Sequence, residues 1–404
     1  MQNKTFGSAL IVAGTTIGAG MLAMPLTSAE MGFGYTLTLL FILWALLSYS
    51  ALLFVEVYQK AERQDAGIAT LAEQYFGMFG RVLATLSLVV FMYAILTAYI
   101  VGSGGDLLVP LFSFLGENAK SVSIVAFAVI FGVFVTIGTG SVDIVTRLLF
   151  IVKLLAFGFV LIMMLPQVSL ENLGAMPLKD FLLISASPVF FTSFGFHVVI
   201  PSINKYLDGN IKRLRTAIIV GTGIPLFAYI LWQMAIHGVF AQSQFVEIVR
   251  ANPTLSGLVD ATYQATGSAF ISGAVTTFSA VALITSFLGV SLALFDCLDD
   301  LLKRINIKAN RISLGLLTFI PPVFFALFYT DFLNSLTYAG QMFTFYGLVL
   351  PVGMAWRFRK LYPEAPYRVI GGGFSLLLAL ILGLLIMNVP FLIDAGYLPK
   401  VIGA

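Results

Sequence analysis

Residues 14–20 read Gly-Thr-Thr-Ile-Gly-Ala-Gly and lie near the middle of an apolar run that extends from residue 6 to residue 29. The run is long enough to cross a bilayer as a helix. Three glycines within seven residues disfavour a helix, because each costs about 1 kcal/mol relative to alanine. A helix broken inside hydrocarbon exposes backbone groups that lipid cannot satisfy, so a break is tolerated only where it lines a cavity or contacts a ligand. We therefore predict that the backbone of this stretch forms a binding site.

The composition of the chain indicates a membrane protein. Of its 404 residues, 59% are hydrophobic and 10% are charged, whereas a soluble domain carries about 25% charged residues. With one cysteine, Cys297, and two histidines, we expect no internal disulfide, no metal site and no cofactor. The first run has no small-residue cleavage motif, so we interpret it as a retained helix and not as a signal peptide.

Apolar runs repeat along the whole chain and predict an all-α polytopic membrane protein with a single transmembrane domain, residues 1–404. Apolar residues at helical spacing from Ile68 to Phe76 predict a short interfacial helix, with Asp65 as its cap and Gly77 as its end; the alternative is a solvated loop. The mixed connection 241–267 could form part of an external lid. The eleven predicted spans are 6–29, 34–58, 82–112, 122–139, 144–166, 181–203, 216–240, 268–298, 312–329, 332–356 and 373–393.

Lysine and arginine are distributed unevenly over the connections between these runs. If the N-terminus is cytoplasmic, the outer connections hold only four of the 22 basic residues, namely Lys120, Lys179, Arg250 and Lys400. The excess of lysine and arginine on the other side follows the positive-inside rule. It predicts a cytoplasmic N-terminus, an odd number of crossings and a C-terminus on the outside.

The sixth run is interrupted in the same manner as the first, with Phe-Thr-Ser-Phe-Gly-Phe-His at residues 191–197. When Gly18 is aligned with Gly195, the threonines at 15–16 fall over the Thr-Ser pair at 192–193. Two broken runs at matching places in the halves of a chain point to the binding site of an inverted-repeat transporter. We predict repeats over residues 6–166 and 181–356, with an additional helix at 373–393.

The two breaks offer complementary backbone groups. A half-helix beginning after Gly20 would direct free N–H groups and its positive dipole end toward a carboxylate, and carbonyls freed around residues 191–194 would suit an ammonium group. The alternative is that these small residues only allow close helix packing. Residues 18–23 also fit a G-x-G-x-x-A nucleotide pattern, which we reject because no strand precedes it.

Lys153 is the charged side chain that these runs place deepest in the bilayer. It lies nine residues after Ile144, which is about 13 Å along a helix. An ionisable group at that depth is a functional candidate: it could gain and lose a proton during transport, or stay charged and replace a sodium ion. The alternative is a lysine that snorkels toward the inner surface. Thr285 and Ser286 in the eighth run could supply hydroxyls nearby, although such residues often bond to their own helix.

Aromatic side chains near the breaks are candidates for a ring-binding pocket, with ordinary core packing as the alternative for each. His197 could titrate near neutral pH or be a buried neutral histidine. The predicted substrate-binding residues are Thr15, Thr16, Ile17, Gly18, Ala19, Gly20, Tyr93, Tyr99, Phe191, Thr192, Ser193, Phe194, Gly195, Phe196 and His197, and the predicted ion-coupling residues are Lys153, Thr285 and Ser286.

Three motifs together resemble a known family. Gly-Thr-Thr-Ile-Gly-Ala-Gly-Met-Leu-Ala-Met-Pro at 14–25, the stretch 191–197 and Leu-Asp-Gly-Asn at 207–210 are similar to the bacterial hydroxy/aromatic amino acid permeases. That family lies in the amino acid/polyamine/organocation superfamily, and the chain is most similar to its tyrosine-specific members. The resemblance covers essentially the whole chain, including Ala-Gly-Tyr-Leu-Pro at 395–399.

The resemblance implies a LeuT-type 5+5 inverted repeat with discontinuous helices 1 and 6 and an eleventh helix, in the bacterial inner membrane with a periplasmic C-terminus. It implies proton-coupled import of L-tyrosine by alternating access, without enzymatic activity. Residues 15–20 would hold the carboxylate and residues 191–195 the amine. Lys153 would stand where other carriers bind sodium, beside the hydroxyl pair Thr285 and Ser286.

The partners implied are L-tyrosine or another aromatic amino acid, protons and membrane lipid, with neither nucleic acid nor an obligate protein partner. Tryptophan carriers share most of these features, so a tryptophan or broad aromatic permease is the first alternative. A passive facilitator is the second, although the sequence has no repeated filter-like segments or acidic rings. An intramembrane enzyme is disfavoured, because the runs contain neither an acidic pair nor a His partnered with a Cys.

Overall fold

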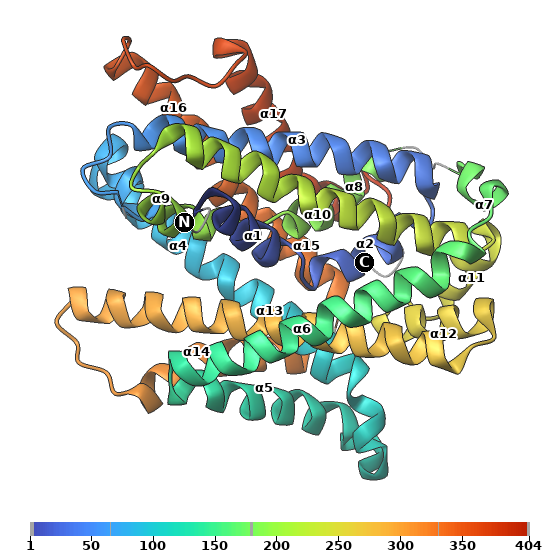
Figure 1. Cartoon of the computed structure of the whole chain (residues 1–404). Helices are drawn as coiled ribbons and strands as arrows, with labels where there is room; N and C mark the ends of the chain where they lie inside the picture. Colours follow the sequence, from blue (N-terminus) through green and yellow to red (C-terminus); the bar gives the residue numbers. More distant parts are fainter. Residues whose placement is uncertain (1–3, 65, 178–180, 330, 402–404) are drawn as a thin grey trace.

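The computed structural model describes residues 4–64, 66–177, 181–329 and 331–401, and within these ranges all regular secondary structure is helical (Figure 1). Nine helical segments of this part of the chain are long and apolar enough to cross a membrane, and the bent pair α1 and α2 brings the number to ten. The elements are α1 (Lys4–Thr16), α2 (Gly20–Ser28), α3 (Gly32–Tyr58), α4 (Ile68–Gly102), η1 (Ser103–Leu107), η2 (Val109–Asn118), α5 (Ala119–Ile137), α6 (Thr139–Met164), η3 (Leu165–Gln167), α7 (Leu170–Gly174), α8 (Leu182–Ser193), η4 (His197–Val199), α9 (Ile200–Tyr206), α10 (Ile211–Val239), α11 (Gln242–Ala251), α12 (Leu255–Thr266), α13 (Ala269–Arg304), α14 (Arg311–Phe328), α15 (Phe332–Thr344), η5 (Phe345–Val349), α16 (Leu350–Leu361) and α17 (Gly372–Asp394).

The prediction of an all-helical polytopic protein is confirmed, since each of the eleven predicted runs falls on helical segments. The run at 332–356 is helical as α15, η5 and α16 but is not among the nine spans. Polar side chains such as Asn334 and Gln341 lower its hydropathy.

The segment 68–76 is helical, as predicted, and its place at the membrane interface stays a prediction. Helix α4 begins at Ile68, and Gly77, with φ +66° and ψ −161°, divides this first part from the long remainder of the helix. Glycine suits the position because it adopts positive φ without a steric penalty. Gly67 occupies the N-cap position, and the predicted cap Asp65 lies outside the described residues. The connection 241–267 forms the two helices α11 and α12.

The two interrupted runs lie in the interior of the bundle. Figure 1 shows α1 and α2 among the other helices, with α3 and α10 on one side and α6 and α13 on the other. Helix α8 packs against α2 and α3. In the α8–α9 segment 72% of the most apolar 18 residues are buried, compared with 22% in α6 and 28% in α14. The latter helices present apolar faces outward, as expected where lipid is the solvent.

Close approach of α1 and α10 depends on Gly221. A Cβ atom there would lie 2.6 Å from the Cβ of Val12 and 2.8 Å from the carbonyl oxygen of Ala9. We expect Gly221→Val to lower the free energy of unfolding by about 1–3 kcal/mol, because the overpacked helices must separate. The measurement is the melting temperature of the purified protein in detergent. Gly223→Val on the same helix is the matched control, because no atom lies within 4 Å of a Cβ there; equal melting temperatures would contradict this contact.

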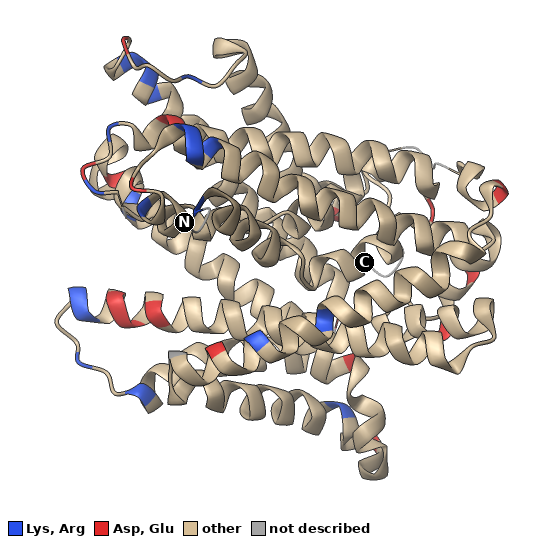
Figure 2. Cartoon of the chain, in the orientation of Figure 1, with Lys and Arg blue, Asp and Glu red and all other residues tan. Residues whose placement is uncertain are grey.

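A buried ion pair fixes one end of the bundle. The fully buried carboxylate of Glu56 on α3 accepts hydrogen bonds from Arg359 Nε and Nη2, at 2.6 and 2.9 Å, and from the backbone N–H of Val369 at 2.9 Å. Gln59 bonds both backbone groups of Tyr367, at 2.7 and 3.0 Å. The segment before α17 is therefore tied to α3. Figure 2 shows that lysine and arginine gather toward this end, on the left in that view, where the N-terminus also lies.

Candidate functional site

The first apolar run changes direction at the glycine-rich stretch. Helix α1 ends at Thr16, α2 begins at Gly20, and the two axes differ by 53°. The N–H of Ala19 donates to Ser286 Oγ at 3.3 Å, a side chain of α13, and not to a backbone carbonyl. After the gap, Met21 and Leu22 donate to the carbonyls three residues earlier, as in a tight first turn. The gap therefore depends on α13 for part of its hydrogen bonding.

The second interrupted run has a gap of similar kind. Helix α8 ends at Ser193 and α9 begins at Ile200, with the short turn η4 between them. The N–H groups of Phe194 and Gly195 donate to Phe191 and Thr192, at 3.2 and 3.0 Å. The hydroxyls of Thr192 and Ser193 each donate to a carbonyl of α8 itself, at 2.8 Å. These two hydroxyls are therefore engaged within their own helix.

Tyr229 of α10 joins the two gaps. Its hydroxyl lies 2.7 Å from the carbonyl oxygen of Thr16 and 2.7 Å from that of Ser193, which are the last residues of α1 and α8. A Cβ atom added to Gly20 would lie 2.8 Å from the Cα of Ser193, so the two gaps are in direct contact. Sequence reasoning missed Tyr229. The available signal was a phenol in the middle of a long apolar run, where its hydroxyl needs a partner.

Lys153 reaches the first gap from α6. Its side chain is 3% exposed, and its Nζ donates to the carbonyl oxygen of Ile17 at 2.9 Å. In the described part of the chain no acidic side chain contacts this ammonium group; it lies 5.0 Å from the ring centroid of Phe150. The hydroxyl of Tyr99 on α4 lies near the side chain of Ser286. Three predicted residues, Lys153, Ser286 and Tyr99, are thus brought to the first gap.

Three other predicted residues hydrogen-bond groups outside the two gaps. The hydroxyl of Tyr93 donates to the carbonyl of Leu317 on α14, at 2.8 Å. Thr285 donates to Ala282 of its own helix at 3.1 Å. Thr15 is exposed and donates to Ile11 at 2.8 Å. In this conformation these three hydroxyls do not bond the two gaps.

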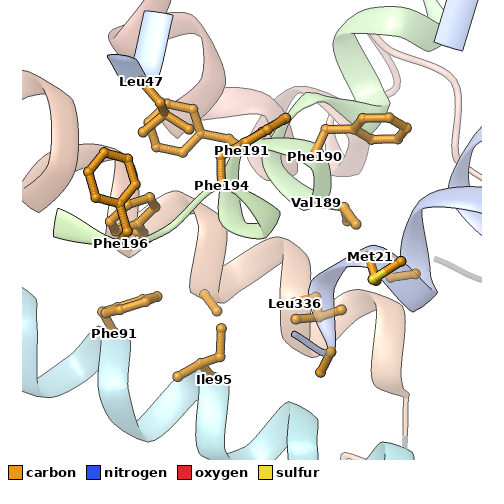
Figure 3. Close-up of a cluster of buried hydrophobic side chains, with 14 of the residues drawn as sticks. Met21, Leu47, Phe91, Ile95, Val189, Phe190, Phe191, Phe194, Phe196 and Leu336 are labelled. Carbon is orange, nitrogen blue, oxygen red and sulfur yellow. The ribbon is translucent and has the colours of Figure 1, made fainter. Parts of the chain in front are cut away.

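Aromatic rings surround the second gap. Phe343 of α15 lies 5.1 Å from Phe91, 5.2 Å from Phe191 and 5.5 Å from His197, measured between ring centroids. Neither sequence periodicity nor motif singled out Phe343. Figure 3 shows the predicted aromatic residues of this gap gathered with side chains of α2, α4 and α15, and the labelled members of this cluster include Met21, Phe91, Phe191, Phe194, Phe196 and Leu336.

Comparison with known proteins identifies the family to which this architecture belongs. Residues 1–390 match the model of the tryptophan/tyrosine permease family. The chain belongs to this family. The resemblance expected from the motifs is therefore confirmed, and a permease is a transporter and not an enzyme.

The permease has close relatives in Haemophilus influenzae. It is 59% identical to "Tyrosine-specific transport system 1" and 58% identical to "Tyrosine-specific transport system 2", over 100% of each chain. It is 33% identical to the "Tryptophan-specific transport protein" of the same organism, over 94% of this chain and 93% of that protein. The greater similarity to tyrosine-specific members agrees with the expectation from the motifs.

In the permease, the end of α2 is covered by α11. Arg250 of α11 pairs with the carboxylate of Glu30, and Gln242 donates to the carbonyl oxygen of Ala29. A cavity of about 660 Å³ lies beside this ion pair, and its lining includes Glu171 and Asn172. These contacts link the connection 241–267 to the half-helix that follows the first gap.

Proposed function

We propose that this permease is a proton-coupled symporter that imports L-tyrosine across the bacterial inner membrane by alternating access. The observation that carries the proposal is the direct contact between the two gaps, bridged by one tyrosine hydroxyl and reached by a buried lysine. The tyrosine-specific names of the two relatives support the choice of substrate.

The backbone at the gaps would bind the charged ends of the amino acid. The start of α2 would direct the positive end of its dipole toward the carboxylate. The N–H groups of Ala19, Met21 and Leu22 have partners in this conformation, so a bound carboxylate would have to compete for them. The carbonyl oxygen of Ser193 has two lone pairs and can accept from the ammonium group while it contacts Tyr229. In this proposal residues 15–20 and 191–197 form the substrate site, with Tyr99 beside them.

The fold proposed for the permease is a LeuT-type 5+5 inverted repeat in one transport domain, with discontinuous helices 1 and 6. Repeat one covers residues 6–166 and repeat two residues 181–356, and the helix at 373–393 is additional. Helix α1 ends at Thr16 and α8 at Ser193, the two positions that coincide when Gly18 is aligned with Gly195. Matching break positions support two related halves.

Lys153 would couple transport to protons. Its hydrogen bond to Ile17 links the charge of Lys153 to the conformation of the first gap. Ser286 links α13 to the same gap by accepting from the N–H of Ala19. In this proposal the buried amine gains and loses a proton during the transport cycle, as an intramembrane ionisable group can. A permanently charged amine could instead take the place of a sodium ion. Thr285 lies beside Ser286 and completes the proposed ion-coupling set.

The proposed orientation has the N-terminus in the cytoplasm and the C-terminus in the periplasm. The gathering of basic residues at one end of the bundle supports it (Figure 2). The covered end of α2, with Glu30 and Arg250, would then face the periplasm.

Uptake into proteoliposomes tests the proposal. With an inward proton gradient, labelled L-tyrosine should accumulate above its outside concentration, and an uncoupler should abolish the accumulation. Uptake that equilibrates but never accumulates would identify a passive facilitator. Accumulation that requires sodium would identify sodium, and not the proton, as the coupling ion. Stronger competition by tryptophan than by unlabelled tyrosine would identify a tryptophan permease, and no uptake of any aromatic amino acid would reject the proposal.

A further inference from the structure

We propose that His197 recognises the phenol hydroxyl of tyrosine, in a subsite walled by Phe54 and Phe343. The inference rests on the proposed function as an aromatic amino acid carrier, and it names the residue that would distinguish tyrosine from phenylalanine.

The hydrogen-bonding state of His197 is the first observation. The side chain is completely buried, and neither ring nitrogen has a hydrogen-bond partner. Among the described residues it is the one side chain with two such buried polar atoms; the others have one each. A neutral imidazole carries one donor and one acceptor, and folded proteins satisfy nearly all buried groups of this kind. The unmet donor and acceptor therefore point to a partner that is not part of the chain.

The walls around His197 are aromatic. Its ring centroid lies 5.8 Å from that of Phe54 on α3, 5.5 Å from that of Phe343 on α15 and 4.9 Å from that of Phe196. The rings of Phe54 and Phe343 meet the imidazole at 65° and 71°, close to edge-to-face. Apolar walls with a few placed polar groups are typical of small-molecule sites, and aromatic walls suit a phenol ring.

The position of His197 links it to the proposed substrate site. It lies three residues after Phe194, at the start of the turn that follows the second gap. Gly195 packs against the same Phe343 ring, since a Cβ atom there would lie 3.4 Å from two of the ring carbons. The carbonyls proposed for the ammonium group and the imidazole proposed for the phenol are therefore parts of one short segment.

The chemistry distinguishes the aromatic amino acids. A phenol both donates and accepts, so it can pair with whichever imidazole nitrogen faces it. Phenylalanine has the same ring without the hydroxyl and leaves His197 unpaired. Sites that hydrogen-bond a substrate hydroxyl reject the analogue that lacks it for this reason.

The test measures binding of L-tyrosine and L-phenylalanine to the purified full-length permease, by competition with labelled tyrosine. The native protein should bind tyrosine about 10- to 100-fold more tightly than phenylalanine, as expected when a buried hydrogen bond is left unmade. His197→Phe should remove most of this ratio by weakening tyrosine alone. His197→Gln, which keeps a donor and an acceptor, should retain part of it.

His237→Phe is the matched control. His237 is also buried, but its Nε2 lies 3.0 Å from Ser28 Oγ near the end of α2, so its loss should leave the tyrosine-to-phenylalanine ratio unchanged. An unchanged ratio in His197→Phe, or an equal loss of both affinities, would overturn the inference. If that variant fails to fold, a native protein that binds the two amino acids within about threefold of each other overturns it as well. If His197→Phe binds tyrosine with the native tyrosine-to-phenylalanine ratio, this inference alone is rejected. If the native protein binds no aromatic amino acid, the proposed function is rejected.

Discussion

Lys153→Met should reduce the proton-driven accumulation of tyrosine to an equal concentration on both sides of the membrane. A one-proton symporter with a gradient of about one pH unit can accumulate its substrate about tenfold, because 1.4 kcal/mol corresponds to a factor of ten. Methionine keeps most of the length of the side chain but removes the ammonium group that donates to Ile17. Accumulation is measured in proteoliposomes, and exchange of internal for external tyrosine at saturating concentration should persist.

Lys308→Met provides the control for this result. Lys308 is exposed in the connection between α13 and α14, so its replacement should leave both accumulation and exchange intact. Full accumulation by Lys153→Met would show that the lysine has no coupling role. Loss of exchange and binding together would assign Lys153 a structural role at the first gap.

Gly20→Val should weaken tyrosine binding by about 10- to 100-fold. A Cβ atom there would lie 2.8 Å from the Cα of Ser193, a backbone atom that cannot rotate away, so the two gaps must move apart. Overpacking of this kind costs about 1–3 kcal/mol, and the loss of affinity follows if that cost is borne by the bound conformation. Equilibrium binding to the purified protein provides the measurement.

Gly7→Val is the control on the same apolar run, because no atom lies within 4 Å of a Cβ there. Both variants are first tested for a monodisperse elution profile in detergent. An unaltered tyrosine affinity in Gly20→Val would argue against a substrate carboxylate at the start of α2.

The gaps could be located from sequence because the signal is local. Glycines 14, 18 and 20 disfavour a helix wherever they stand, and an apolar run with such residues must satisfy its backbone by other means. The depth of Lys153 could also be counted from sequence, because it lies nine residues after Ile144 in the fifth apolar run. Local chemistry and helix rise sufficed for these features.

Contacts between distant runs could not be predicted in this way. Tyr229 and Phe343 approach the gaps from α10 and α15, and nothing in their own neighbourhoods shows which helix they face. Helix rotation decided other cases: Tyr93 and Tyr99 are six residues apart, so their side chains point about 120° apart. Tyr99 therefore faces Ser286 while Tyr93 faces α14.

The bridging phenol has one proton and two carbonyl oxygens at equal distance, 2.7 Å each. At any instant it can donate to one of them only, and the second oxygen competes for the same proton. Either half-helix can therefore move away without leaving the hydroxyl unpaired, because the hydroxyl then donates to the carbonyl oxygen that stays. Separating the ends of α1 and α8 at Tyr229 therefore costs at most about one hydrogen bond, whichever of the two moves.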